Sequence, residues 1–74
     1  MRVGDEFSCG GFDWVISSIE AIDKNMKKTI EAMVNSGKEP VRYFASKKLK
    51  SGKQSKQGGM FFMFKESQKF IKVL

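Results

Sequence analysis

The sequence predicts a mainly β protein, a small barrel of five to six short antiparallel strands. Turn signals recur at intervals of about ten to fourteen residues, and the segments between them are rich in β-branched and aromatic residues. The chain has 74 residues, which leaves room for one domain only. We therefore expect a single domain over residues 1–74.

The first hairpin is predicted around a pair of glycines. Val3–Phe7 leads to Gly10-Gly11, and Phe12–Ile16 follows. Adjacent glycines supply the positive φ angles that a tight β-turn requires. Trp14 and Ile16, two residues apart, then share one face of the second strand.

Residues 17–36 allow two interpretations. As strands, Val15–Ile22 ends at a turn over Asp23–Asn25, and Lys28–Val34 alternates as the next strand. As a helix, apolar residues recur every three or four positions, and Gly37 is placed to end it. We favour strands, because the helix would begin directly after a β-branched run. An α+β domain with one helix at about 17–36 is the alternative.

The second half predicts three further strands and a basic loop. Val41–Ala45 is typical of a strand, and Met60–Phe64 and Lys69–Leu74 form a hairpin around the turn Lys65–Gln68. Residues 47–59 contain five Lys and three Gly with one apolar residue. Such a composition does not fill a core, so we expect a mobile basic loop over 47–59.

The order of strands and turns in part of the chain resembles that of SH3-like barrels. The segments that carry the likeness are Val3–Phe7, Trp14–Ile16, Lys28–Ala32 and Gly37–Glu39. An SH3-like or OB-like barrel also matches the chain in size. The likeness is architectural, so it implies a fold and no particular activity.

The composition argues against catalysis, a metal site or a cofactor. The chain has no His, and its one Cys, Cys9, has no base to activate it. One Cys and scattered carboxylates do not make a four-ligand metal site. We expect a non-enzymatic, cytoplasmic protein, because single-Cys usage fits a reducing compartment and no secretory leader opens the chain. The longest apolar run, Met60–Phe64, is too short to span a membrane.

Charge is distributed unevenly along the chain. The formal net charge is +6, made up of −2 over residues 1–37 and +8 over residues 38–74. Residues 40–65 contain no carboxylate. This asymmetry predicts one basic face and a polyanionic partner.

Nucleic-acid binding without catalysis is the leading hypothesis. The predicted phosphate contacts are Arg42, Lys47, Lys48, Lys50, Lys53 and Lys56. The predicted base-stacking residues are Tyr43 and Phe61. Lysine is a point charge without the planar fork that recognises guanine, so we expect little sequence specificity.

Two other partners fit the same sequence. The protein could be an inhibitor or adaptor that docks its basic and aromatic surface on an acidic protein. It could also form a homodimer through Met60–Phe64. The same apolar run has an explanation that involves no partner. Met60–Phe64 is then a central strand of the sheet, buried on both faces.

Overall fold

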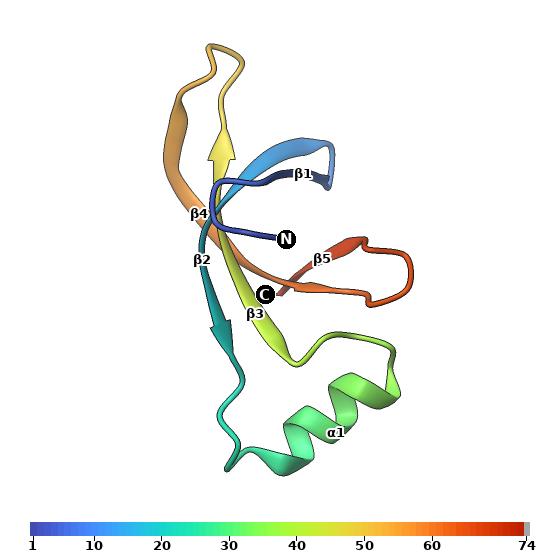
Figure 1. Ribbon diagram of the computed structural model, residues 1–74. Coiled ribbons are helices and arrows are strands. Elements are labelled where there is room, and N and C mark those ends of the chain that lie inside the picture. Colours follow the sequence, from blue (N-terminus) through green and yellow to red (C-terminus); the bar gives the residue numbers. More distant parts are fainter. Residues whose placement is uncertain (74) are drawn as a thin grey trace.

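The computed structural model describes residues 1–73 and contains an antiparallel sheet with one short helix (Figure 1). The elements in chain order are β1 (Glu6–Cys9), β2 (Phe12–Ala21), α1 (Lys27–Asn35), β3 (Val41–Lys48), β4 (Gln54–Met63) and β5 (Phe70–Val73). Each strand pairs with the next one along the chain, which gives a five-stranded sheet. The sheet curls into a half-barrel, which confirms the predicted mainly β class.

The core lies on the concave face of the sheet. Its buried residues are Trp14, Ile16, Tyr43, Ala45, Phe61 and Met63. They alternate with more exposed neighbours along β2, β3 and β4, as expected for a sheet with one buried face. The Phe61 side chain has no exposed surface, and its ring lies 5.0 Å from that of Phe7 and 4.9 Å from that of Trp14.

Side chains join the two outer strands of the half-barrel. The ring of Phe7 on β1 stacks on the ring of Phe70 on β5, with 3.9 Å between centroids. The Cys9 thiol donates a hydrogen bond to the Phe70 carbonyl oxygen, with 3.6 Å between sulfur and oxygen. Within residues 1–73, β1 and β5 share no backbone ladder. The seam between them therefore depends on aromatic packing.

Residues 17–36 contain a strand end, a turn and a helix. The predicted strand over Lys28–Val34 is wrong, because these residues belong to α1. The alternative helix at about 17–36 is correct only from Lys27 onward, because β2 continues to Ala21. The segment lies beyond the end of the sheet (Figure 1), where a helix satisfies its own backbone groups without a neighbouring strand. No helix within residues 1–73 has the length and apolar character that crossing a membrane requires.

The loop predicted over residues 47–59 is mostly a β-hairpin. β3 continues through Lys48 and β4 begins at Gln54, so only residues 49–53 connect them. Gly58 and Gly59 lie within β4, opposite Ser46 and Ala45 of β3. The prediction was wrong because backbone pairing with β3 continues where the side chains of β4 add no apolar surface.

Most of the remaining predicted strands are present, but the first one is shifted. β1 begins at Glu6, so the predicted strand Val3–Phe7 is correct only for Glu6 and Phe7, because residues 3 and 4 form a turn. Gly10 and Gly11 form the turn between β1 and β2, with φ angles of 62° and 82°. β3 contains the predicted strand Val41–Ala45, and β5 forms most of the last predicted strand. Leu74, the last residue of that predicted strand, lies outside the described residues.

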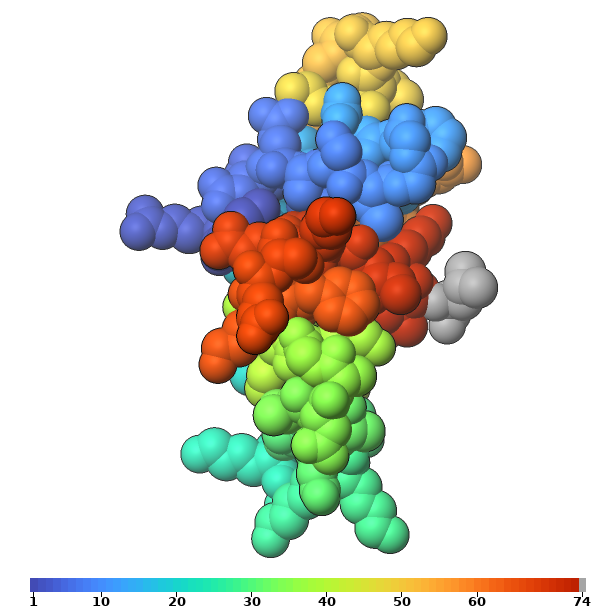
Figure 2. All heavy atoms as spheres, turned by 90° about the vertical axis from the view of Figure 1, so that its right-hand side faces the viewer, coloured from blue at the N-terminus to red at the C-terminus, as the bar shows by residue number. Residues whose placement is uncertain are grey.

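The molecule is elongated, with principal extents of 41 × 22 × 22 Å. The β3–β4 hairpin forms one end and α1 forms the other, as the space-filling view shows (Figure 2). The lysine-rich segment therefore projects away from the core.

Candidate nucleic-acid interface

Five of the predicted lysines lie together on the β3–β4 hairpin. They are Lys47 and Lys48 at the end of β3, Lys50 and Lys53 in the connection, and Lys56 near the start of β4. The connection closes through backbone hydrogen bonds, from Leu49 N–H to the Lys53 oxygen at 2.8 Å and from Gly52 N–H to the Leu49 oxygen at 2.9 Å. Gly52 has a φ of 85°, which a glycine adopts at little cost. The side chains of Lys50, Lys53 and Lys56 are exposed.

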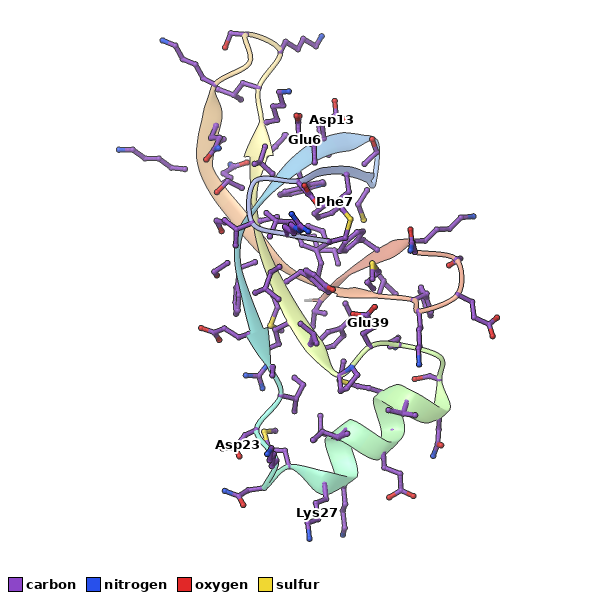
Figure 3. All side chains as sticks on the ribbon, in the orientation of Figure 1. Glu6, Phe7, Asp13, Asp23, Lys27 and Glu39 are labelled. Atoms are coloured by element: carbon purple, nitrogen blue, oxygen red, sulfur yellow. The ribbon has the colours of Figure 1, made fainter. Side chains whose placement is uncertain are left out.

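Two carboxylates lie beside the base of this hairpin. Figure 3 shows Glu6 and Asp13 near each other on the β1–β2 hairpin, toward the β3–β4 hairpin. Lys48 forms an ion pair with Glu6. The hydrogen bond to Glu6 and the charges of Glu6 and Asp13 raise the pKa of Lys48. The positive charge that remains unpaired is therefore concentrated toward the hairpin tip.

Phe12 is an exposed ring next to the lysines, and sequence reasoning did not select it. Its side chain is 49% exposed, and the Lys47 ammonium lies 3.6 Å from the centre of the ring. Phe12 lies two residues before Trp14, but the core does not extend to this first residue of β2. Its place directly after the Gly10-Gly11 turn, at a strand end, was the signal for exposure.

Lys72 adds a further cation from β5, also missed from the sequence. Its register partner on β4 is Phe61, which places it on the concave face. Its ammonium lies 5.1 Å from the Trp14 ring centre. Gly59 leaves the space this requires, because a Cβ there would lie 3.1 Å from Lys72 Cε. Gly59 therefore lets a lysine from β5 reach toward the β1–β2 hairpin.

The base-stacking roles predicted for Tyr43 and Phe61 are wrong. Tyr43 is 4% exposed and Phe61 is 0% exposed, so neither ring has a face open to a ligand. The Tyr43 ring meets the Phe70 ring edge to face at 5.2 Å. Both residues belong to the core. They are register partners on β3 and β4, so their side chains lie on the same buried face of the sheet.

Arg42 lies apart from the hairpin lysines. It precedes Lys48 by six positions on β3, which corresponds to about 20 Å along a strand. Its register partner is Glu20 on β2, and its Nη2 atom lies 4.0 Å from the Met26 sulfur. The structure therefore separates Arg42 from the other predicted phosphate contacts.

Two surface hollows near α1 lie away from the hairpin. One of about 460 Å³ separates the end of α1 from the β4–β5 turn and is lined by residues that include Val34, Phe64 and Ser67. Another of about 360 Å³ follows α1 itself, with Lys28, Met33 and other residues around it. Within residues 1–73, no three His, Cys, Asp or Glu side chains gather in a way that could hold a metal ion.

Comparisons with protein-family models, curated proteins and solved structures gave no match to this chain. The candidate interface is accordingly defined by its own geometry. It consists of the hairpin lysines Lys47, Lys50, Lys53 and Lys56, with Lys72 and the exposed ring of Phe12 beside them.

Proposed function

We propose that this protein is a nucleic-acid-binding module that contacts the phosphate backbone through its β3–β4 hairpin. One observation carries the proposal. The hairpin projects beyond the core, exposes Lys50, Lys53 and Lys56, and has no carboxylate of its own. Lysines that neutralise phosphates release condensed counterions, which drives binding without base recognition.

The shape of the hairpin agrees with this use. A two-stranded β-ribbon is narrow enough to enter the major groove of a duplex. The residues at its tip offer ammonium groups and no guanidinium fork, so base discrimination through guanine is weak. Phe12 adds apolar ring surface beside Lys47, which a base or sugar could cover.

A second candidate is docking on an acidic protein surface, as an inhibitor or adaptor. Glu6 and Asp13 at the base of the hairpin favour it, because carboxylates there repel a continuous phosphate backbone. A protein partner can place carboxylates against the tip and a cation against Glu6 and Asp13.

The test is a titration of labelled single- and double-stranded oligonucleotides by fluorescence anisotropy, at low and at moderate salt. The first variant replaces Lys50, Lys53 and Lys56 with Gln. The matched control replaces Lys24, Lys27 and Lys28 with Gln, which removes the same charge at the α1 end. If three phosphate contacts are lost, the slope of log K against log salt falls by roughly 2–3 in the hairpin variant and stays near the parent value in the control.

Equal effects of the two triple variants would contradict the hairpin as the site, because net charge alone would then explain binding. No binding of the parent at low salt would contradict nucleic-acid binding altogether. The acidic-protein candidate then requires a discrete partner that is retained from nuclease-treated lysate by the parent and lost by the hairpin variant.

A further inference from the structure

The outer face of the half-barrel carries a patch of apolar side chains. The sheet register aligns Phe44, Met60 and Val73 in one row across β3, β4 and β5. Phe62 and Ile71 form the next row on the same face. These five residues, which we call the outer patch, alternate with the core residues of the same strands and so point away from the core.

Within residues 1–73, no other element covers the outer patch. α1 lies beyond the end of the sheet, and the β1–β2 hairpin curls over the concave face (Figure 1). Ile71 is 42% exposed, and the other four residues of the outer patch are half-buried. A hollow of about 300 Å³ is lined by Phe62, Ile71 and Val73 together with Lys38 and Lys72. Contiguous apolar surface of this kind marks an interaction site.

The charges beside the patch are self-complementary. Glu20 and Arg42 are register partners on the same face as Phe44, each two positions from the Phe44 row. Among the described residues they form no ion pair with each other, and Arg42 lies against Met26 instead. In an interface with two-fold symmetry, each copy brings the same patch, so the Glu20 of one copy can meet the Arg42 of the other.

Two lysines, Lys38 and Lys72, line the hollow beside the outer patch, and both contact aromatic rings of their own chain. The Lys38 ammonium lies 5.7 Å from the centre of the Phe64 ring. The Lys72 ammonium lies on the concave side, over Trp14. Both cations therefore lie at aromatic rings, with Lys38 at the edge of the outer patch, where it lines the same hollow as Phe62 and Ile71.

We propose that the outer patch binds a second copy of this chain, in a two-fold dimer that pairs Glu20 of each copy with Arg42 of the other. The surface is separate from the lysine hairpin, so this inference stands whether or not the protein binds nucleic acid. The outer patch has five residues, far fewer than the roughly 20–30 residues per partner of a standard interface, so we expect a weak and reversible dimer.

Sedimentation velocity over a wide range of protein concentration tests the dimer. The parent is expected to show a reversible monomer–dimer equilibrium. Ile71→Lys places a charge in the patch at an exposed position and should raise the dissociation constant at least tenfold. Val3→Lys changes another exposed apolar residue, 61% exposed and outside the patch, and should leave the equilibrium unchanged.

A charge exchange tests the pairing and guards against misfolded variants. Glu20→Arg and Arg42→Glu should each weaken the dimer several-fold, and the double variant should restore it. Circular dichroism confirms that each variant keeps the sheet. A parent that stays monomeric at every concentration would overturn the proposal, as would a dimer unaffected by Ile71→Lys and by both single exchanges.

Discussion

The Tyr43 hydroxyl donates a hydrogen bond to a carboxylate oxygen of Glu39, with 2.9 Å between the two oxygens. Glu39 also donates its backbone N–H to the Met63 carbonyl oxygen at 2.9 Å. The segment that follows α1 is thereby fixed to β3 and β4 at once. Burial, followed by the hydrogen bond and the negative charge of Glu39, raises the pKa of Tyr43 to about 12.

Because of this contact, the free energy of unfolding should fall as the pH becomes alkaline. A phenol in the unfolded chain ionises near pH 10, so the contribution of Tyr43 is complete below that pH and is lost as the pH rises through about 12. The loss is on the order of 3 kcal/mol when complete, and roughly half of it has occurred at pH 11. Urea denaturation at neutral pH and near pH 11 measures that half. Tyr43→Phe should show less alkaline destabilisation than the parent, and the same pH dependence in both proteins would contradict the assignment.

Two phenylalanines should differ sharply in their contribution to stability. Phe61 is completely buried between Phe7 and Trp14, so Phe61→Ala should cost about 3–5 kcal/mol of unfolding free energy. Phe12 is half exposed, and Phe12→Ala removes mainly its contact with Lys47, worth about 1 kcal/mol or less. The urea midpoints of the two variants, each compared with the parent, measure the two losses of unfolding free energy. Similar losses would mean that the core is not centred on Phe61.

Glu6 should limit polyanion binding. Glu6→Gln releases Lys48 from its ion pair and removes a negative charge beside the hairpin, so affinity for an oligonucleotide should rise several-fold at low salt. Stability should change little, because the pair is exposed and screened by solvent. Glu31→Gln on α1 removes an equal charge at the other end of the molecule. An equal gain in that control would show that only net charge matters.

The sequence predicted well where local chemistry decides the conformation. The Gly10-Gly11 pair needs positive φ angles, and its turn is where the sequence places it. The short apolar runs Val41–Ala45 and Met60–Phe64, each flanked by turn signals, correctly indicated strands. What the pattern left open was the side of each strand that faces the core, because sheet register is set by partners distant in the sequence.

The failures share a physical cause, which is the limited extent of the core. The segment over Lys28–Val34 fits both a strand and a helix by pattern, and it is a helix because no neighbouring strand is available beyond the sheet end. Residues 54–59 lack apolar content and nevertheless belong to β4, where Gln54, Gly58 and Gly59 pair with β3 on either side of a register irregularity. Phe12 is apolar and nevertheless exposed, because the core ends before it. Apolar content alone does not reveal where a small core stops.

The seam between β1 and β5 has a consequence for how this chain folds. Within residues 1–73, each backbone ladder of the sheet joins strands that are neighbours in the sequence, so each can form by closing a single connection. The stack of Phe7 on Phe70 instead requires the two ends of the chain to meet, at the largest loop-closure entropy. We expect the hairpins to form first and the ends to dock last. In the native state the same seam would open before the rest of the sheet, and amide hydrogens along β5 would then exchange sooner than those in the middle of β3.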